Sequence, residues 1–240
     1  MMAIKTLLYT IYSRILLIVI MLLAIIPALI LVFVVPQKYR YNSIYFGLSG
    51  LLYWIIIKAS LLPITIIGKE HLPECSAIYI ANHVSSFDIP MLGMLVGTKP
   101  HFWIAMKWLT NFWLFRLFLP RTAVLVDMEN PHGNVRSLIR IMQMTKEQNM
   151  SVMIFPEGGR FVDDKIHSFY GGFTLLAKKT GFPVIPVRIY NLEKVYPPGT
   201  FWIHYYPVKV IIGEPMYMRE DEDDEAFKER VYAWFVNQEQ

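Results

Sequence analysis

The chain contains 240 residues, of which 55% are hydrophobic and only 18% are charged. An ordinary soluble domain has roughly 45–50% apolar and about 25% charged residues, so this composition excludes a disordered chain. The length suits one α/β domain, or one domain with an attachment segment. The single cysteine, Cys75, excludes a disulfide scaffold, and we expect it to be a small buried hydrophobic residue.

The net charge is only +4, but the charges are unevenly distributed. Acidic residues occupy every position of residues 220–225, so the rest of the chain is markedly basic. A basic surface suits an anionic bilayer, a phosphate-bearing substrate or nucleic acid, and the mean hydropathy of +0.38 favours the membrane. The acidic run predicts the start of a helix over residues 225–235, because acidic side chains stabilise helix N-termini.

The N-terminal quarter of the chain is apolar enough to enter a membrane. Residues 15–35 contain no charged side chain, and as a helix they would span about 31 Å, roughly the thickness of the hydrocarbon core. Residues 36–40 then indicate an interfacial stop. A cleaved signal peptide is the alternative, but no small-residue cleavage site follows. With the second apolar segment, residues 43–57, we predict two membrane-attachment helices within residues 1–64, either spanning the bilayer or lying in one leaflet.

From about residue 65 onward, short β-rich runs alternate with helical stretches, which is typical of an α/β domain. We therefore expect a mixed central sheet flanked by helices over residues 65–240. The clearest helix covers residues 134–148, since its apolar side chains recur at helical spacing. The predicted strands are residues 77–81, 123–126, 152–155, 184–189 and 209–212.

Residues 107–120 combine large aromatic side chains with basic ones. Such a segment belongs either to the core or to a surface that docks among lipid headgroups, and the sequence favours neither. The aromatic residues are Trp108, Phe112, Trp113, Phe115 and Phe118, and the basic ones are Lys107 and Arg116.

Two segments have the residue types that catalysis requires, and each directly follows a predicted strand, where open α/β sheets place their sites. In the first, Asp88 follows His83 by five residues. The carboxylate can hold one ring nitrogen while the other nitrogen removes a proton. A single histidine–aspartate pair such as this is also common as a purely structural contact.

The second segment, Phe-Pro-Glu-Gly-Gly-Arg, covers residues 155–160. Its two glycines let the backbone approach a ligand closely. Glu157 offers a hydrogen-bond acceptor, and Arg160 offers a forked cation that suits a phosphate monoester. By itself the segment could equally be a turn that the side chain of Glu157 stabilises.

Taken together, the two segments resemble the glycerolipid acyltransferase family, in particular the 1-acylglycerol-3-phosphate acyltransferases. The resemblance covers residues 65–215 and depends on the order and spacing of Asn-His-x-Ser-x-x-Asp, Phe-Pro-Glu-Gly-x-Arg and Val-Ile-Pro-Val. The apolar N-terminal segments are similar to the two membrane helices of bacterial members. The resemblance therefore implies an inner-membrane enzyme with its catalytic domain on the cytoplasmic face.

The resemblance also implies a role for individual residues. His83 is then the general base that takes the proton from the acceptor hydroxyl, and Asp88 orients it. The hydroxyl attacks the acyl thioester directly. Glu157, Gly158 and Arg160 belong to the acceptor-binding segment, with Arg160 against the phosphate.

Lys107 matches a lysine that family members place near the same phosphate. Two positions depart from the family pattern. Met128 follows Asp127 where many members have arginine, and Gly159 stands where they have threonine or serine. Both departures weaken the case for a lysophosphatidic acid acceptor and leave room for another lysophospholipid.

The implied reaction gives phosphatidic acid from 1-acylglycerol 3-phosphate, with acyl-CoA or acyl carrier protein as donor. The implied partners are membrane lipid and these substrates, without nucleic acid, metal or further cofactor. We expect surface or capping roles for the other five histidines, which show no acid-histidine pattern. They are His71, His101, His132, His167 and His204.

Two further functions stay open. A lipid or thioester hydrolase would use Ser85 or Ser86 as nucleophile beside His83, although the Gly-x-Ser-x-Gly turn typical of such enzymes is absent from the sequence. A membrane adaptor without catalysis would use the basic surface only to bind anionic lipid.

Overall fold

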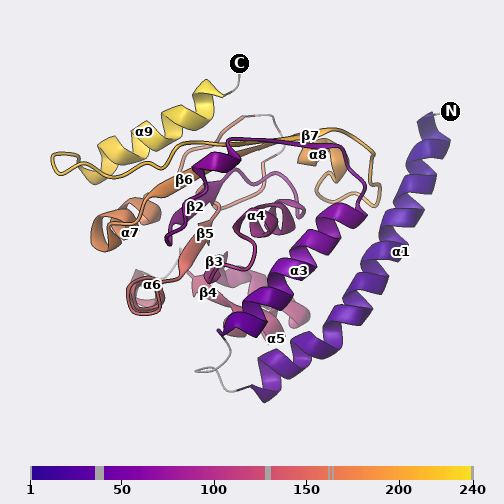
Figure 1. The fold of residues 1–240 in the computed structure, drawn as a ribbon, viewed down its shortest axis with the longest axis horizontal. Helices are drawn as coiled ribbons and strands as arrows, with labels where there is room; N and C mark the ends of the chain where they lie inside the picture. Colours follow the sequence, from indigo (N-terminus) through magenta and orange to yellow (C-terminus); the bar gives the residue numbers. More distant parts are fainter. Residues whose placement is uncertain (1, 36–40, 128–130, 162, 164, 239–240) are drawn as a thin grey trace.

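A mixed seven-stranded sheet lies at the centre of the chain, in the order β1-β7-β6-β2-β5-β3-β4 (Figure 1). The computed structural model describes residues 2–35, 41–127, 131–161, 163 and 165–238, and leaves out some side chains within the helices. Neighbouring strands run parallel except β6 and β7, which are antiparallel. The strands are β1 Ile64–Ile67, β2 Ile78–Ala81, β3 His101–Met106, β4 Ala123–Val126, β5 Ser151–Ile154, β6 Val184–Tyr190 and β7 Val208–Ile212.

The expected α/β class with a mixed sheet is confirmed, and each predicted strand is present within one or two residues of its expected bounds. Two strands, β1 and β3, were not predicted from the sequence. β1 is a four-residue strand that pairs only with β7 at the sheet edge. β3 begins with the buried residue His101 and runs into the aromatic segment, so its sequence lacks a clean alternation.

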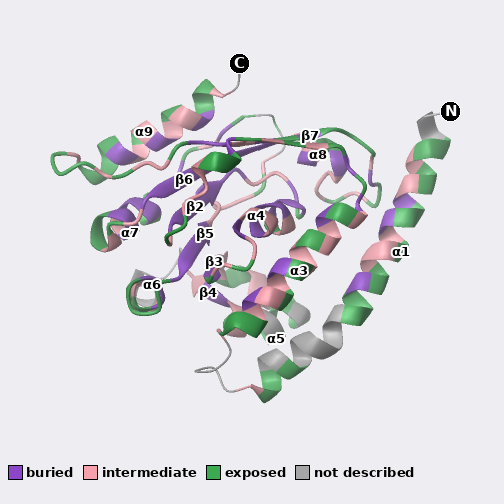
Figure 2. Ribbon diagram, in the orientation of Figure 1, coloured by how far each residue is buried: buried purple, intermediate pink, exposed green. Residues whose placement is uncertain are grey.

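Helices cover both faces of the sheet and enclose two separate apolar cores. Because side chains alternate along a strand, Ile78 and Ile80 of β2 pack toward α6 (Pro131–Lys146), α7 (Gly172–Thr180) and α9 (Asp224–Asn237). Tyr79 packs toward α3 (Ser43–Ala59) and α4 (Asp88–Val96) on the other face. Figure 2 shows the strands as the most buried part of the molecule. The helices of the domain are α4 Asp88–Val96, α5 Trp113–Thr122, α6 Pro131–Lys146, α7 Gly172–Thr180, α8 Leu192–Val195 and α9 Asp224–Asn237, with short 3₁₀ turns η2 Lys69–His71 and η3 Lys107–Asn111.

The acidic run does begin the C-terminal helix, as predicted. Asp223 caps α9, and its side chain accepts a hydrogen bond from the N–H of Ala226 at 2.7 Å. Phe227, Val231 and Phe235 recur every four residues and are fully buried against the sheet. The cap fixes where α9 begins, and this apolar stripe fixes which side faces inward.

The apolar N-terminal segments form two helices, α1 (Met2–Leu29) and α3 (Ser43–Ala59), joined through the π-helical turn η1 (Ile30–Val34). α3 packs against α4, and α1 lies outside α3 (Figure 1). Among the described residues, one helix is long and apolar enough to cross a membrane, Ile4–Leu23, and it overlaps the first part of residues 15–35. The predicted stop at residues 36–40 lies outside the described residues, and the division between residues 64 and 65 stays a prediction.

Polar contacts hold the middle of α1 to the catalytic domain. Thr10 Oγ1 donates to the carbonyl of Ile203 at 3.0 Å and accepts from the N–H of the same residue at 3.1 Å. The Arg14 guanidinium donates to the carbonyl of Phe201 at 2.6 Å. One side of α1 therefore contacts the rest of the protein rather than lipid.

The prediction that Cys75 is buried was wrong. The thiol is exposed, in the loop between η2 and β2. The core begins two residues later at Ala77, where the chain enters the sheet. Cys75 therefore lies just outside the packed core.

The close approach of α3 to the domain gives a stability test. A Cβ at Gly50 would lie 2.8 Å from the carbonyl oxygen of Gly97, whereas a Cβ at Gly47 on the same helix meets nothing within 4 Å. We expect Gly50→Ala to lower the free energy of unfolding by about 1–3 kcal/mol because the backbone of Gly97 must move. Gly47→Ala should raise it by about 0.5–1 kcal/mol through helix propensity. Unfolding of both variants in detergent checks this, and equal stability would contradict the close contact.

Candidate active site

The sheet topology brings the two predicted catalytic segments together. Strands β2 and β5 are parallel neighbours, with Ile80 opposite Ile154. Residues 82–88 leave the carboxyl end of β2, and residues 155–160 leave the carboxyl end of β5. Both segments therefore emerge at the same edge of the sheet, where parallel strands place their ligand sites.

His83 and Asp88 form the pair that their spacing predicts. The distance from His83 Nδ1 to Asp88 Oδ2 is 2.8 Å. The same oxygen accepts from the N–H groups of Val84 at 2.7 Å and Ser85 at 2.8 Å. Burial raises the pKa of Asp88, and the hydrogen bonds from His83 and these amides oppose that rise. With Asp88 ionised, Nδ1 carries the hydrogen and Nε2 is the basic nitrogen.

The imidazole ring is also fixed by packing. It stacks on Phe155, with 4.0 Å between ring centroids and 11° between ring planes. The His83 side chain is 18% exposed, and it lines the cavity described below. Stacking and the bond to Asp88 together fix the ring at the cavity wall, an arrangement in which Nε2 could take up a proton.

Glu157 joins the two segments from inside. Glu157 is only 5% exposed. Its Oε1 accepts a hydrogen bond from the N–H of His83 at 3.1 Å, and its Oε2 accepts one from the N–H of His167 at 3.0 Å. Burial raises the pKa of Glu157, while these two amides and the charges of His167 and Arg188 act in the opposite direction. Both oxygens are thus engaged with the backbone, which supports a positioning role for Glu157.

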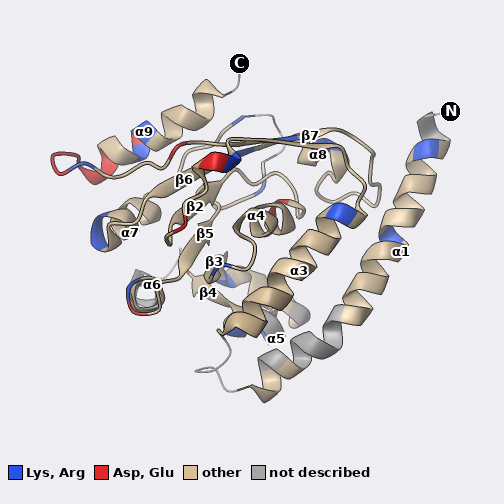
Figure 3. Cartoon of the chain, in the orientation of Figure 1, with Lys and Arg blue, Asp and Glu red and all other residues tan. Residues whose placement is uncertain are grey.

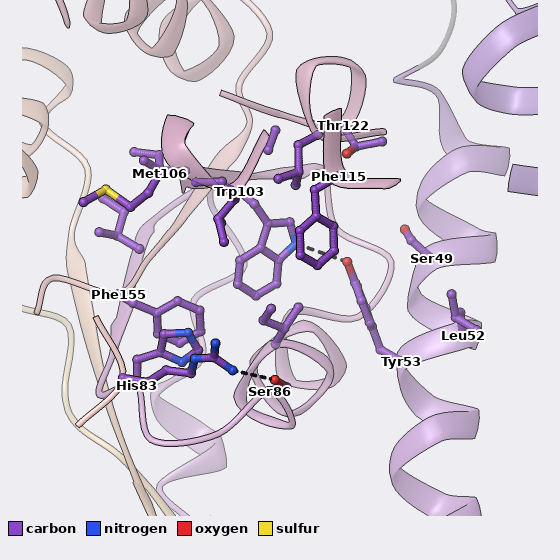
Figure 4. Close-up of a pocket in the computed structure, with 18 of the residues that line it drawn as sticks. Ser49, Leu52, Tyr53, His83, Ser86, Trp103, Met106, Phe115, Thr122 and Phe155 are labelled. Atoms are coloured by element: carbon purple, nitrogen blue, oxygen red, sulfur yellow. Dashed lines mark hydrogen bonds between the residues drawn. The ribbon is translucent and has the colours of Figure 1, made fainter. Parts of the chain in front are cut away.

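Gly158 and Arg160 bring the second segment to the cavity. Gly158 has a φ of +69°, and a Cβ there would lie 2.6 Å from the Tyr170 ring, so only glycine fits. Arg160 Nη1 donates to Ser86 Oγ at 2.9 Å. His83 and Arg160 line the same cavity, and Figure 4 shows His83 together with the hydrogen bond that reaches Ser86.

Lys107 is placed differently. Its Nζ donates to Asp127 Oδ2 at 2.8 Å, which links the ends of β3 and β4. Among the described residues that line the cavity, its neighbours Met106 and Trp108 occur but Lys107 does not. Met128 lies outside the described residues. The contribution of Lys107 to phosphate binding stays a prediction.

A cavity of about 720 Å³ extends from His83 between α1, α3, β3 and α5. Its walls are mainly apolar, and Trp103 Nε1 donates to the Tyr53 hydroxyl at 3.1 Å across one wall (Figure 4). Ser49 and Thr122 lie on the opposite side from His83 in this view. Sequence reasoning missed Tyr53 and Trp103, because nothing in a linear pattern shows that α3 and β3 face one cavity.

The expectation that His167 has no acidic partner was also wrong. His167 Nε2 lies 3.0 Å from Asp163 Oδ1, four residues earlier. Phe161 stacks on the His167 ring at 3.8 Å between centroids, and its N–H donates to the carbonyl of His83 at 3.1 Å. The Asp-x-x-x-His spacing was the signal that could have found this pair. The Asp163–His167 pair helps to hold the loop that follows β5.

Comparison with known proteins gives consistent results. A family model described as Acyltransferase matches residues 63–190. A 1-acyl-sn-glycerol-3-phosphate acyltransferase from Limnanthes douglasii is 28% identical over 203 residues, covering 80% of this chain and 68% of the relative. A probable 1-acyl-sn-glycerol-3-phosphate acyltransferase from Mycoplasma pneumoniae is 28% identical over 158 residues, covering 64% of this chain and 57% of the relative.

A solved structure has the same fold. The crystal structure of the 1-acyl-sn-glycerophosphate acyltransferase from Thermotoga maritima aligns with a TM-score of 0.73 and 22% sequence identity, covering 99% of this chain and 97% of the other. The alignment includes the N-terminal helices as well as the sheet, since nearly the whole of each chain is covered.

The two hydrogen bonds accepted by Glu157 give a test of its positioning role. Glu157→Gln keeps one acceptor oxygen but turns an N–H donor toward a backbone N–H. We expect the free energy of unfolding to fall by about 1–3 kcal/mol. Glu70→Gln, at an exposed position, should change it by less than about 0.5 kcal/mol. Denaturant unfolding measures both, and a Glu157→Gln variant as stable as the control would argue against the bridge.

Proposed function

Because the chain belongs to the acyltransferase family, we propose that it transfers a fatty acyl group from a thioester donor to the sn-2 hydroxyl of 1-acylglycerol 3-phosphate, giving phosphatidic acid. The resemblance drawn from the two catalytic segments is confirmed at the level of the family. One observation carries the proposal: His83, which is hydrogen-bonded to Asp88, lines the same cavity as Arg160, and the walls of that cavity are mainly apolar.

In the proposed mechanism, His83 Nε2 removes the proton of the acceptor hydroxyl while the oxygen attacks the thioester carbonyl carbon. An oxygen ester forms, the carbon–sulfur bond breaks, and the thiolate takes the proton from the imidazolium. Asp88 stabilises the imidazolium and holds the tautomer in which Nε2 is free to act. General base assistance contributes about 10²–10⁴ in rate, and positioning in the cavity supplies much of the rest.

Arg160 is the residue proposed to bind the acceptor phosphate. Its guanidinium can make paired hydrogen bonds with a phosphate monoester, and Ser86 Oγ holds it at the cavity. Gly158 and Gly159 also line this part of the cavity and leave room for the glycerol backbone. Because Gly159 supplies no hydroxyl, a lysophospholipid with another headgroup remains the alternative acceptor.

The apolar part of the cavity beyond His83, which we call the channel, is proposed to hold a fatty acyl chain. Its aromatic and aliphatic walls suit a hydrocarbon, and the donor is acyl-CoA or acyl carrier protein. No part of this mechanism requires a metal or a further cofactor.

We further propose that α1 and α3 attach the domain to one leaflet. The polar contacts of Thr10 and Arg14 lie within Ile4–Leu23, so a spanning α1 would carry the bound domain into the hydrocarbon core. The bacterial inner membrane, with the catalytic domain on its cytoplasmic face, is our predicted location.

The hydrolase alternative has less support. Ser85 is fully buried, and its hydroxyl donates to the carbonyl of Tyr196 at 3.0 Å. The Ser86 hydroxyl accepts from Arg160. Both hydroxyls therefore have partners other than His83, whereas a serine nucleophile needs the imidazole as its base.

Thiol release from acyl-CoA tests the reaction. We expect release to depend on added 1-acylglycerol 3-phosphate, and His83→Ala to lower kcat by about 10²–10⁴ through loss of the general base. His204→Ala, in the loop before β7, is the matched control and should keep wild-type kcat. Equal release with and without acceptor would instead identify a thioesterase, and a panel of lysophospholipids identifies the headgroup.

Chain-length preference tests the channel. Ser49 lines the cavity from α3, away from His83. Ser49→Phe should fill that end, so that kcat/KM falls about tenfold or more for long acyl donors and stays near wild type for short ones, since overpacking excludes the terminal methylenes. Ser49→Ala should leave the preference unchanged. A uniform loss across all chain lengths would mean that the chain lies elsewhere.

A further inference from the structure

We propose that η3 and α5 form a second membrane-contact surface, which seats the mouth of the catalytic cavity against an anionic bilayer. We call residues 107–122 the aromatic rim. The inference rests on the proposed function only in that a lipid acceptor must reach the cavity from a membrane. It concerns a part of the chain separate from the apolar pair α1 and α3.

The aromatic rim exposes large apolar side chains to an unusual degree. Trp113 is 79% exposed, Phe112 is 58% exposed and Trp108 is 54% exposed. Phe115 and Leu117 of α5 are exposed as well. A group of exposed apolar side chains marks a site of contact with lipid or protein. Exposing apolar surface to water is unfavourable, and a lipid or protein partner that covers this surface offsets that free energy. The exposure of these side chains excludes the core alternative for them, and docking among lipid headgroups is the alternative that we propose.

The charge of the aromatic rim favours an anionic lipid surface. Residues 107–122 contain three basic residues and no acidic ones. Arg116 is exposed between Phe115 and Leu117, so its stem can lie along apolar surface while its charge reaches a phosphate. The acidic run before α9 lies at the far side of the molecule (Figure 3). This separation orients the aromatic rim, rather than the opposite side, toward negative charge.

The aromatic rim also adjoins the apolar end of α1. The Arg121 guanidinium lies over the Phe33 ring at 4.7 Å from its centroid, which joins the end of α5 to η1. Ile30 and Val34 of η1 are 49% and 71% exposed. The exposed apolar surface therefore continues from η1 onto α5.

The inner side of the aromatic rim is part of the cavity wall. Trp108 and Phe115 line the cavity, whereas Phe112 and Trp113 are not among its described lining residues. Trp and Arg side chains both favour the headgroup layer of a bilayer. With its outer side in that layer, the aromatic rim would let a lysophospholipid pass from the bilayer to His83 without crossing water.

The test compares an acceptor presented in vesicles with one dissolved as monomers. The vesicles are phosphatidylcholine with or without phosphatidylglycerol, and the monomeric acceptor is a short-chain 1-acylglycerol 3-phosphate. Phe112→Ser/Trp113→Ser in the full chain should lower kcat/KM about tenfold or more for the vesicle acceptor only, because these side chains lose their burial in lipid. The matched control is Tyr217→Ser/Val236→Ser, two exposed apolar residues near α9, and it should behave as wild type.

A second measurement does not require activity. Brominated phosphatidylcholine quenches tryptophan that enters a bilayer, and we expect Trp113→Phe to remove part of the quenched fluorescence. This readout still tests the aromatic rim if the chain transfers no acyl group at all. Arg116→Gln should reduce the stimulation of vesicle activity by phosphatidylglycerol.

The inference is overturned if the double variant keeps wild-type activity on vesicles and Trp113 stays unquenched. It is also overturned if light scattering shows that the double variant converts a dimer to a monomer while Trp113 stays unquenched, since the aromatic rim would then be a contact between copies of the chain.

Discussion

One buried carboxylate oxygen organises the candidate site. Asp88 Oδ2 accepts three hydrogen bonds, two from backbone amides of its own loop and one from His83. A charge inside a protein is costly unless such donors surround it, so the loop is stable only in the conformation that aims them at Asp88. That conformation is also the one that presents the other imidazole nitrogen to the cavity. The same geometry supplies three donors to Asp88 Oδ2 and suits the general-base role proposed for the histidine.

Further polar side chains fix this loop to the strands beside it. Asn82 Nδ2 donates to the carbonyl of Ile189 at 2.8 Å, and Asn82 Oδ1 accepts from the N–H of Ile189 at 2.7 Å, which ties the loop to β6. Glu157 ties it to the segment after β5. Because the loop is held from both neighbouring strands, the position of His83 depends on the central sheet rather than on a mobile surface segment. Such support from a rigid sheet is what a precisely placed general base requires.

The apolar N-terminal helices lie on the same side of the molecule as the candidate site. The cavity lies between the N-terminal helices and the sheet edge that carries His83, and its lining includes apolar side chains of α3 as well as the polar groups of His83, Ser86 and Arg160. Arg14 and Thr10 hold α1 against the domain at that side of the molecule. The acidic run of residues 220–225 lies at the other side (Figure 3). An orientation with respect to a membrane is therefore built into the distribution of side chains.

The sequence by itself determined the local features. Asp88 follows His83 by five residues at the end of one short loop, which lets the two side chains meet, and α9 begins where Asp223 caps it and buries the stripe that its spacing predicts. Only the tertiary structure decided which groups meet across the sheet. It turned Glu157 toward two amides, paired Lys107 with Asp127, placed Tyr53 beside Trp103, and left Cys75 exposed. Periodicity and capping are encoded within a few residues, whereas these contacts depend on strand order and on the packing of segments far apart in the chain.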